Sequence, residues 1–560
     1  MSEHYDLLVR GGTLIDGTGA PRQTGDLAIS NGKIAAMGSV SGTADREIDA
    51  TDCIVSPGFV DIHTHYDAQV MWDRMLTISP WHGVTSVVVG NCGFGIAPTR
   101  EAHRELILRT LENVEGMSYA ALQAGVGDDW GFESFPQYLD AVENRGTAIN
   151  FAALLGHTPL RMFVMGEEST EREATAAEIA QMQVITREAL DAGAIGFATS
   201  KSPTHVGYAG RPVPSREASY EEICALASCL GEFDHGVMQA TVGAGLFFEQ
   251  FGEIAASTNT PVTWTALLAG MAGPGSHRGF LEASEKLTDQ GLEVYPQVTC
   301  RPLNFEFQFK APFLFESLPY FKQVSQADHA GKKSIYADEA FRAEFRQKVA
   351  GGITGSWEET VVAECADDPS LNERRVSEVA AERGVHPVDL VLDLALASDL
   401  EARFRMAVFN TDEDAVAELL QHPGVILGLS DAGAHASQLC DACFSTHLLS
   451  YWVREKEVLD LEKAVSLLTS RSADVFGIRD RGRLVPGLAG DLAIFNPNEV
   501  GCSPLKRVND LPGGGDRLIS DAEGIRAVVV NGVVVREEGA DAIDPDASMP
   551  GQVLRKGVGA

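Results

Sequence analysis

The chain has 560 residues, of which 44% are hydrophobic and 22% are charged, and these proportions exclude a disordered, collagen-like or coiled-coil protein. Its 44 Lys and Arg residues stand against 79 Asp and Glu residues, giving a formal net charge of −35. Such a surface repels phosphate backbones and anionic lipids, so nucleic acid and membranes are poor partners. The acidity itself is explained at least as well by a salty habitat or by simple solubility as by any function. The length suits a large barrel with an appended domain.

The sequence shows no pattern typical of export or membrane insertion. Its first residues lack the basic and apolar regions of a signal peptide, and no uncharged apolar run approaches the ~18 residues that a membrane span needs. The nine cysteines are scattered, which argues against a disulfide framework. We expect a cytoplasmic protein, and a homo-oligomer is compatible with the sequence.

Short strands of alternating character are predicted at both ends of the chain. Asn31-Gly32 near the start and Asn531-Gly532 near the end each separate two apolar runs, which is a strong hairpin signal. Two β-rich segments of matching character flank a different middle, which predicts one small β-sandwich built from residues 1–55 and 480–545. The strand candidates are Tyr5–Val9, Asp26–Ser30, Lys33–Met37, Gly490–Phe495, Ile525–Val530 and Val533–Val535.

The middle of the chain, residues 56–479, alternates between short apolar runs and amphipathic stretches. Two of the stretches, Thr175–Leu190 and Ser219–Leu230, open with capping boxes typical of helices. Eight strand candidates alternating with helices predict an α/β fold, a (β/α)8 TIM barrel. An open doubly wound sheet is the alternative, but no phosphate-binding glycine motif follows the first strand. The eight candidates are Phe59–Ile62, Ser86–Gly90, Ile149–Leu155, Ala194–Thr199, Val237–Val242, Pro261–Leu268, Leu292–Val298 and Val425–Leu429.

The gap between the seventh and eighth strand candidates is far longer than an ordinary loop, which predicts an insertion at about residues 301–400. It opens with an aromatic stretch, Leu303–Phe321, and continues into helical segments such as Asp338–Val349. An insertion there overhangs the end of the barrel at which loops carry chemistry. A lid over an apolar pocket, a dimer contact and an ordinary insertion with its own core are all compatible with it.

The most specific feature is the run Gly58–His65, in which an apolar strand leads directly into His63-Thr64-His65. Side chains at positions i and i+2 of a strand point to the same side, so both imidazoles project together from the strand end. Imidazole is a common ligand of zinc and related metals, and two on one rigid strand hold a fixed geometry. The pair is a candidate metal site; two histidines satisfied by neighbouring carboxylates are the structural alternative.

Two further strand ends carry candidate ligands. Cys92 follows the second strand among glycines and is a candidate thiolate ligand or nucleophile, although a lone cysteine is usually neither. Asp431 follows the last strand and faces the histidines across the barrel, where a carboxylate is suited to bind a metal and to exchange a proton with water. Cys440 and Cys443 have redox spacing, but they lie outside a thioredoxin-like context, and we interpret them as helix packing.

Together these residues resemble the amidohydrolase superfamily, and more closely its D-aminoacylase (N-acyl-D-amino-acid deacylase) branch. The resemblance implies a zinc-dependent (β/α)8 hydrolase in which His63, His65, Cys92 and Asp431 surround the metal. The motifs that carry it span nearly the whole chain: Gly58–His65, Gly90-Asn91-Cys92-Gly93, Gly156-His157-Thr158-Pro159-Leu160-Arg161, Ser430-Asp431, Thr469–Gly477 and Gly482–Ala493.

The chain departs from this family on strands five and six, each of which supplies one histidine in the family. Here Gln239 stands about where the first histidine is expected, and Trp264 or Thr265 where the second is. Four ligand-capable groups remain and four suffice for one zinc ion, so we predict one tightly bound Zn2+ and leave a second, weak site open. His157 and His435 also lie near strand ends, where they are candidates for supporting the metal, replacing a lost ligand or contacting substrate; a hydrogen-bonding or polar-core role is the alternative.

An N-acyl amino acid carries a carboxylate, so an enzyme this acidic has to supply local cations to bind it. Arg161, Lys201 and Arg301 follow strands three, four and seven on the expected catalytic face. Arginine favours two-point binding of a carboxylate and lysine a point contact. Tyr295 stands in a Tyr-Pro strand that resembles the branch and is a candidate for orienting the scissile carbonyl. For all four residues a surface or structural salt bridge is the alternative.

We therefore expect a metal-dependent amidohydrolase that cleaves a C–N amide bond, with an N-acyl amino acid as its small-molecule substrate. The metal would lower the pKa of a bound water, while Asp431 takes the proton of that water and returns it to the leaving amine. Two alternatives stay open: a different metal-dependent reaction on a divergent substrate, and a catalytically retired barrel that serves as a binding protein. The survival of four dispersed ligands argues against the second alternative.

Overall fold

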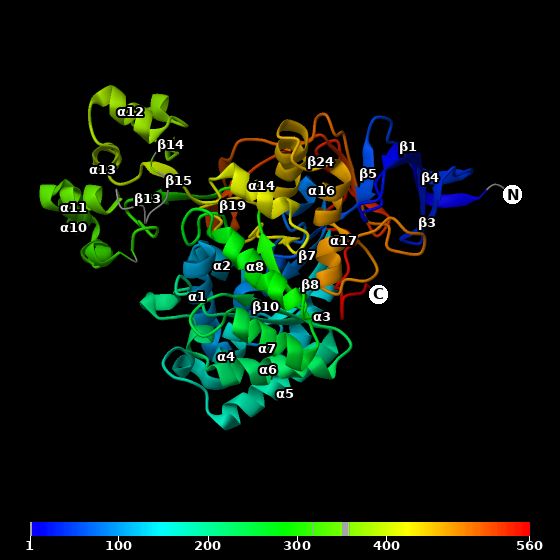
Figure 1. The fold of residues 1–560 in the computed structure, drawn as a ribbon, viewed down its shortest axis with the longest axis horizontal. Helices are drawn as coiled ribbons and strands as arrows, with labels where there is room; N and C mark the ends of the chain where they lie inside the picture. The colour runs from blue at the N-terminus through cyan, green and yellow to red at the C-terminus, as the bar shows by residue number, and fades with distance from the viewer. Residues whose placement is uncertain (1–2, 317, 350–356, 358, 560) are drawn as a thin grey trace.

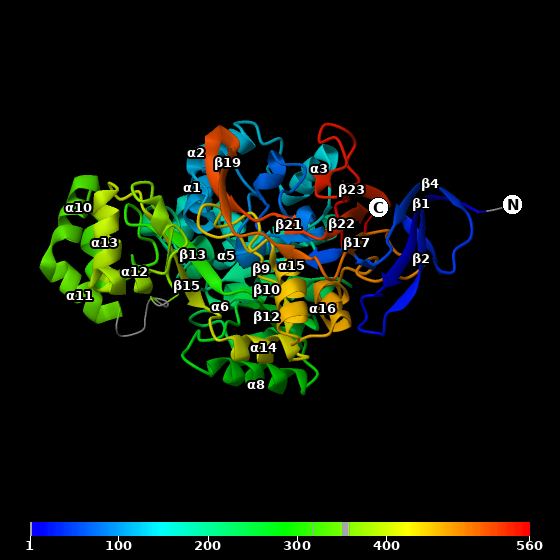
Figure 2. The ribbon, with the colours of Figure 1, turned by 90° about the horizontal axis from the view of Figure 1, so that it is seen from above.

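The molecule is elongated, with a parallel sheet at its centre. The structure is a computed structural model that describes residues 3–316, 318–349, 357 and 359–559. Figure 1 shows strands β1–β4 at one end, helices α10–α13 at the other and the parallel strands between them, and Figure 2 shows the same arrangement from above. Our predicted sandwich and insertion ranges include residues 1–2, 317, 350–356 and 358, which lie outside the described residues. None of the helices in the described part of the chain combines the length and apolarity needed to cross a membrane.

Eight parallel strands form the central sheet in the order β6-β7-β8-β9-β10-β11-β12-β16, which confirms the predicted eight-stranded parallel sheet. Backbone hydrogen bonds connect its two edges: Asp431 N donates to His63 O over 3.1 Å, and His65 N donates to Ala432 O over 2.7 Å. The sheet is therefore curled, and the fold is α/β and TIM-barrel-like. The strands are β6 (Phe59–Asp61), β7 (Val84–Val89), β8 (Asn150–Gly156), β9 (Gly196–Ser200), β10 (Val237–Thr241), β11 (Val262–Thr265), β12 (Val294–Val298) and β16 (Ile426–Leu427).

Helices lie around this sheet, and two of them show how the sequence sets their starts (Figure 1). Helix α5 begins after a complete capping box, because Thr175 Oγ1 accepts from Glu178 N and the Glu178 carboxylate accepts from Thr175 N. In α6, Ser219 Oγ accepts from Glu222 N, but the Glu222 side chain turns into the core, so the predicted box is only half formed. The helices are α1 (Arg104–Glu115), α2 (Tyr119–Val126), α3 (Phe135–Arg145), α4 (His157–Met165), α5 (Ala176–Ala192), α6 (Tyr220–Ser228), α7 (Phe248–Thr258), α8 (Ser276–Thr288), α14 (Glu413–Gln421), α15 (Phe444–His447), α16 (Leu461–Leu468) and α17 (Ser470–Val475).

Strands from both ends of the chain share one nine-stranded sheet, in which β5 lies between β1 and β17 and β4 pairs with β1. The predicted Asn31-Gly32 and Asn531-Gly532 turns close the β2–β3 and β22–β23 hairpins, and both residues of each turn have positive φ, as a tight hairpin requires. Because β5 runs almost directly into β6, this sheet fixes the start of the barrel. Its strands are β1 (His4–Leu14), β2 (Gln23–Ser30), β3 (Lys33–Gly38), β4 (Thr43–Asp49), β5 (Ile54–Pro57), β17 (Leu492–Phe495), β22 (Ile525–Val530), β23 (Val533–Glu537) and β24 (Ala540–Asp541).

Most residues from β13 to β15, between β12 and β16, pack around an apolar core of their own. Their small antiparallel sheet has the order β13-β15-β14, and rings such as Phe309, Phe315 and Phe345 fill the space between it and the helices. Most of the aromatic stretch therefore packs within this unit, whereas Phe305 reaches the loop after β16, where its ring centroid lies 5.5 Å from that of His435. The elements are β13 (Leu303–Gln308), β14 (Val361–Glu364), β15 (Arg403–Phe409), α9 (Lys322–Ser325), α10 (His329–Ala337), α11 (Glu339–Val349), α12 (Val376–Arg383) and α13 (Pro387–Ala397).

Candidate metal centre

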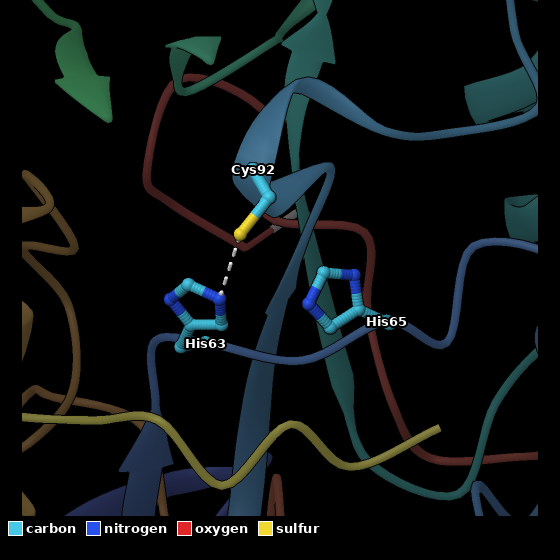
Figure 3. A group of neighbouring side chains, drawn as sticks. All are labelled: His63, His65 and Cys92. Atoms are coloured by element: carbon cyan, nitrogen blue, oxygen red, sulfur yellow. Dashed lines mark hydrogen bonds between the residues drawn. The ribbon is translucent and has the colours of Figure 1, made fainter. Parts of the chain in front are cut away.

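Four ligand-capable side chains meet at the carboxyl ends of the barrel strands, called the mouth below. His63 and His65 follow β6 and Cys92 follows β7, and their ligand atoms lie within 4.8 Å of one another (Figure 3). Cys92 Sγ lies 3.4 Å from His63 Nε2. Asp431, after β16, brings its Oδ1 to 3.4 Å from His63 Nε2 and to 3.7 Å from His65 Nε2. The structure thus brings together the four residues that we expected around a metal.

The turn that carries Cys92 is held against neighbouring strands by glycines and by one side-chain amide. Cys92 itself has a φ of 56°. A Cβ on Gly90 would lie 2.2 Å from Leu154 O, and one on Gly93 would lie 2.9 Å from Thr199 Cα, so no larger residue fits at either position. Gln239 Oε1 accepts from Cys92 N over 2.6 Å. These contacts fix the thiol toward the two histidines.

Contacts on the far side of each imidazole leave one ring nitrogen free toward the mouth. His63 Nδ1 lies 2.6 Å from Gln297 Oε1, and Gln297 Nε2 donates to Thr263 Oγ1 over 3.1 Å, which orients the amide oxygen toward the ring. His63 Nδ1 therefore carries a proton, which leaves Nε2 as the nitrogen that would bind a metal. His65 Nδ1 lies 3.3 Å from Glu115 Oε1, which leaves its Nε2 toward Asp431. Both rings are oriented as metal ligands are.

The imidazoles keep the two acidic groups of the site ionised. Burial alone would raise the pKa of the Cys92 thiol, but His63 and His65 lower it to about 6. Burial also opposes ionisation of Asp431, yet the same two rings lower the pKa of its carboxyl well below the usual range. Beneath them, burial raises the pKa of Asp61 to about 7. At neutral pH the site therefore offers a thiolate and a carboxylate, the forms that bind a cation.

This donor set fits a zinc ion. Imidazole nitrogen, thiolate and carboxylate are the ligand types that zinc takes, and four of them suffice for a tetrahedral site. The side chains of His63 and His65 are almost fully buried, and that of Asp431 is 20% exposed, so the site is open to solvent on the Asp431 side.

Polar groups other than histidine occupy the barrel interior on strands five and six. Gln239 Nε2 donates to Thr265 Oγ1 over 3.2 Å, and Thr265 Oγ1 donates to Thr241 Oγ1 over 3.1 Å. Trp264 points outward against α7 and α8, and its Nε1 donates to Ser284 Oγ over 3.2 Å. Thr265 rather than Trp264 thus takes the inward position, and this hydrogen-bonded chain supports the Cys92 turn.

His157 and Arg161 lie in a buried cluster between α4 and α6. His157 Nε2 lies 2.9 Å from Glu222 Oε1, and its Nδ1 lies 2.8 Å from Thr199 Oγ1. Arg161 forms an ion pair with the other oxygen of Glu222, and the side chains of this pair and of His157 are fully buried. Since these groups pair with one another, the structure supports the polar-core alternative for His157 and the structural salt-bridge alternative for Arg161 instead of a substrate contact.

Lys201 and Arg301 also have internal partners. Lys201 Nζ donates to the backbone carbonyls of Arg216 and Ala218. Arg301 Nε donates to Asp441 Oδ1 over 2.7 Å. Both cations are therefore engaged by groups of the protein, Arg301 in a salt bridge and Lys201 by backbone carbonyls, and do not form an open carboxylate-binding position.

Tyr295 lies at the opposite end of its strand from the mouth, which corrects its expected role at the scissile carbonyl. It precedes Gln297, the residue that contacts His63, by two positions on the same face of β12. Its hydroxyl donates to Glu293 Oε1 over 3.3 Å, and the Arg471 guanidinium lies 4.9 Å from its ring centroid. The Tyr-Pro pattern identified the strand, but the strand register places this ring too deep.

Two histidines line the mouth beside the metal residues. His435 Nδ1 lies 3.2 Å from Gln438 Oε1, and this residue is one of those that lower the pKa of Asp431. His205, in the loop after β9, places its Nδ1 2.7 Å from Ser200 Oγ. The structure thus places His435 at the mouth, as expected, and adds His205.

We did not predict His205, Gln297 or Glu115 from the sequence. Each is a single polar residue outside any motif, and its contact with the site depends on packing between distant segments. The one available signal was the two-residue period of β12, which puts Gln297 on the same face as Tyr295 and nearer the mouth.

Comparison with known proteins gives a consistent result. A profile of the amidohydrolase family matches residues 46–536. D-aminoacylase of Alcaligenes xylosoxydans xylosoxydans is 31% identical over 554 residues, which cover 96% of each chain. The structure of N-acyl-D-glutamate deacylase from Bordetella bronchiseptica, complexed with zinc and a phosphonate mimic of the tetrahedral intermediate, aligns with a TM-score of 0.68 and 28% identity over 99% of this chain and 100% of that one. A D-aminoacylase structure described for its binuclear metal centre, with one-metal activation and second-metal attenuation, aligns with a TM-score of 0.68 and 26% identity over 98% and 99%. The chain therefore belongs to the amidohydrolase family, in its D-aminoacylase branch.

Proposed function

We propose that this protein is a zinc-dependent amidohydrolase that removes the acyl group from an N-acyl amino acid by cleaving its C–N amide bond. The observation that carries the proposal is the convergence of two imidazoles, a thiolate and a carboxylate at the mouth of the barrel. The names of two similar proteins, D-aminoacylase and N-acyl-D-glutamate deacylase, support the substrate class.

Each residue of the site has a task that follows from its position. His63 and His65 would hold the ion through Nε2, Cys92 through Sγ and Asp431 through a carboxylate oxygen. A zinc ion bound there supplies Lewis acidity, which polarises the scissile carbonyl and makes water a better nucleophile near neutral pH. Asp431 is ionised and partly exposed, so it accepts a proton from the attacking water and returns it to the leaving amine.

We infer one tightly held zinc ion instead of two. Gln239 and Thr265 stand where the family supplies two more histidines, and an amide or a hydroxyl is a weaker zinc ligand than an imidazole. Both side chains also already form hydrogen bonds. Gln239 accepts one from Cys92 N and donates one to Thr265. The similar D-aminoacylase for which one metal activates and a second attenuates supports single-ion chemistry on this scaffold.

The proposed organisation follows the sequence-based ranges. Residues 1–55 and 480–545 form a composite β-sandwich, residues 56–479 form the hydrolase barrel, and an insertion interrupts it at about residues 301–400. The sheet shared by both chain ends and the separate apolar core between β12 and β16 support these boundaries. We expect the protein to act in the cytoplasm on a small substrate that carries a carboxylate.

Metal analysis followed by a substrate panel tests the function. Protein purified without added zinc should keep about one equivalent of zinc through dialysis and should hydrolyse members of a panel of N-acyl D- and L-amino acids. Protein that retains no metal would favour the retired barrel. Protein that retains zinc but hydrolyses no amide would favour a different reaction on the same scaffold.

A further inference from the structure

The segment after β9, residues 201–218, brings a histidine and an arginine together beside the metal centre. The ring centroid of Phe94 lies 6.2 Å from that of His65 and 5.0 Å from that of His205, so Phe94 connects His205 with the metal centre. Arg216 Nη1 donates to His205 O over 3.0 Å. The arginine is therefore the immediate neighbour of a residue that lines the mouth.

Arg216 is half-buried and has no counter-ion. Among the residues that the structure describes, no carboxylate forms an ion pair with its guanidinium, and its one side-chain hydrogen bond uses Nη1. Nε and Nη2 remain, and a guanidinium offers its donors in a planar fork. Carboxylates outnumber cations by 79 to 44 in this chain, so an arginine without a counter-ion beside the mouth departs from the general pattern. Such an arginine is suited to bind an external carboxylate.

Lys201, which we expected to contact the substrate carboxylate, instead holds the backbone that carries Arg216. Its Nζ donates to Arg216 O and to Ala218 O. Arg216 N also donates to Val213 O over 3.0 Å. Because this backbone is fixed, less conformational entropy is lost when the guanidinium binds an anion.

The two sides of the mouth differ in charge. Burial lowers the pKa of the His205 ring to about 3, so this ring is neutral and the positive charge on the β9 side comes from Arg216. β9 and β16 lie four strands apart in the curled eight-stranded sheet and face each other across the barrel. On the β16 side, the ring of Phe305 packs at 5.5 Å against both His435 and Phe313. A substrate with one anionic end therefore has a preferred side for that end.

We propose that Arg216 binds the carboxylate of the substrate. The inference rests on the proposed function, because that function supplies the substrate class. Three covalent bonds separate the scissile carbonyl carbon of an N-acyl amino acid from its carboxylate carbon, so a carbonyl at the metal centre brings the carboxylate into the same mouth. Arg216 then takes the part that we had expected of Arg161, Lys201 and Arg301, all of which have internal partners.

Equilibrium binding to the full-length, zinc-loaded protein tests this. The probes are the panel of N-acyl D- and L-amino acids and the α-carboxamide of each, which lacks the charge and is otherwise the same. Calorimetry is done in the Asp431→Asn background, so that the probes are not consumed. We expect the tightest-binding acid to bind ~10–100-fold more tightly than its carboxamide. Arg216→Gln should abolish that preference and leave the affinity for the carboxamide unchanged.

Two further variants sharpen the measurement. Arg216→Lys keeps the charge but loses the two-point contact, so it should retain a reduced preference for the acid, and it decides the matter if Arg216→Gln fails to fold. Arg211→Gln is the matched control on the same segment, because Arg211 already lies 3.6 Å from Glu171, and it should leave the preference unaltered. Zinc content should be equal in all variants.

Steady-state kinetics with Asp431 intact separates this inference from the proposed function. Arg216→Gln should lower kcat/KM for the acid by ~10–100-fold, mainly through KM, and should change kcat/KM for the carboxamide by less than about two-fold. A protein that hydrolyses no probe but prefers the acid through Arg216 would reject the proposed reaction and keep this inference. Equal affinities for acid and carboxamide with Arg216 present would overturn the inference, as would a preference that survives Arg216→Gln or is undiminished in Arg216→Lys, even if hydrolysis occurs. An equal loss of affinity for both probes in Arg216→Gln would show a structural role and overturn it as well.

Discussion

The metal centre and the Glu222 cluster each bring buried histidine together with a carboxylate. At the metal centre, contacts of 3.4 to 3.7 Å join ligand atoms of two histidines, a cysteine and an aspartate. The outer nitrogen of His63 contacts Gln297, and that of His65 lies 3.3 Å from Glu115. In the Glu222 cluster every charged group has a partner of opposite charge or a hydrogen bond. The members of this cluster are His157, Arg161, Thr199 and Glu222.

The difference lies in which lone pairs remain unused. A buried charge is costly unless it is paired, and the Glu222 cluster meets that requirement within the protein. The metal centre gathers a thiolate and a carboxylate around two imidazoles whose Nε2 atoms face them, an arrangement that a bound cation satisfies. Residue type alone therefore does not separate a site from a structural cluster; the remaining donor capacity does.

The largest expected effect follows from removing the two imidazoles. The variant His63→Ala/His65→Ala loses two of four ligands, so tightly bound zinc and hydrolysis should both fall to background while the fold persists. Elemental analysis and a thermal melt measure this. The control is His4→Ala/His329→Ala, which removes two exposed rings and should keep its zinc. Unchanged metal stoichiometry in the first variant would show that the histidines are not ligands.

The second effect concerns proton transfer. Asp431→Asn keeps an oxygen near the metal but removes the basic group, so turnover should fall by ~10²–10⁴-fold with a smaller change in zinc content. Steady-state kinetics on an active substrate, with metal analysis of the same sample, measures both. Turnover close to that of the wild type would mean that His435 or His205 handles the proton.

The third effect should appear in stability instead of chemistry. Glu222→Gln leaves the Arg161 charge buried without a counter-ion, which should cost about 3–5 kcal/mol of unfolding free energy, while the folded fraction keeps its zinc. Burial opposes ionisation of Glu222, but His157 and Arg161 lower its pKa to about 2 from the ordinary 4.5. The Glu222–Arg161 ion pair of the wild type therefore makes its full contribution to the free energy of unfolding above pH 4.5. This contribution is lost as the pH falls toward 2.

Urea unfolding of wild type and variant between pH 3 and pH 7 would measure this difference. The exposed neighbour Glu221 provides the control, since Glu221→Gln should change stability by less than about 0.5 kcal/mol. Equal stabilities of Glu222→Gln and wild type at neutral pH would mean that the pair contributes nothing.

The sequence predicted the parts of this comparison that depend on local patterns. Two histidines at the end of an apolar strand, and a cysteine among glycines, can be recognised within ten residues. The role of Arg161 could not, because its partner Glu222 lies 61 residues away and the pair forms only when α4 packs against α6. Likewise Gln297 contacts His63 across 234 residues, and only the register of β12 decides that Gln297, and not Tyr295, reaches the mouth.

The smallest expected effect comes from Gln297, which touches the metal centre without being a ligand. Its Oε1 accepts from His63 Nδ1 over 2.6 Å and so fixes the ring with Nε2 toward the ion. Gln297→Leu fills the same space without the acceptor, so zinc affinity should fall by ~10–100-fold while stoichiometry at saturating zinc stays unchanged. Competition with a chromophoric chelator measures the affinity. The same substitution at the exposed Gln123 on α2 is the matched control and should leave it unaltered. Equal affinities in the two variants would mean that the barrel, and not this hydrogen bond, sets the orientation of His63.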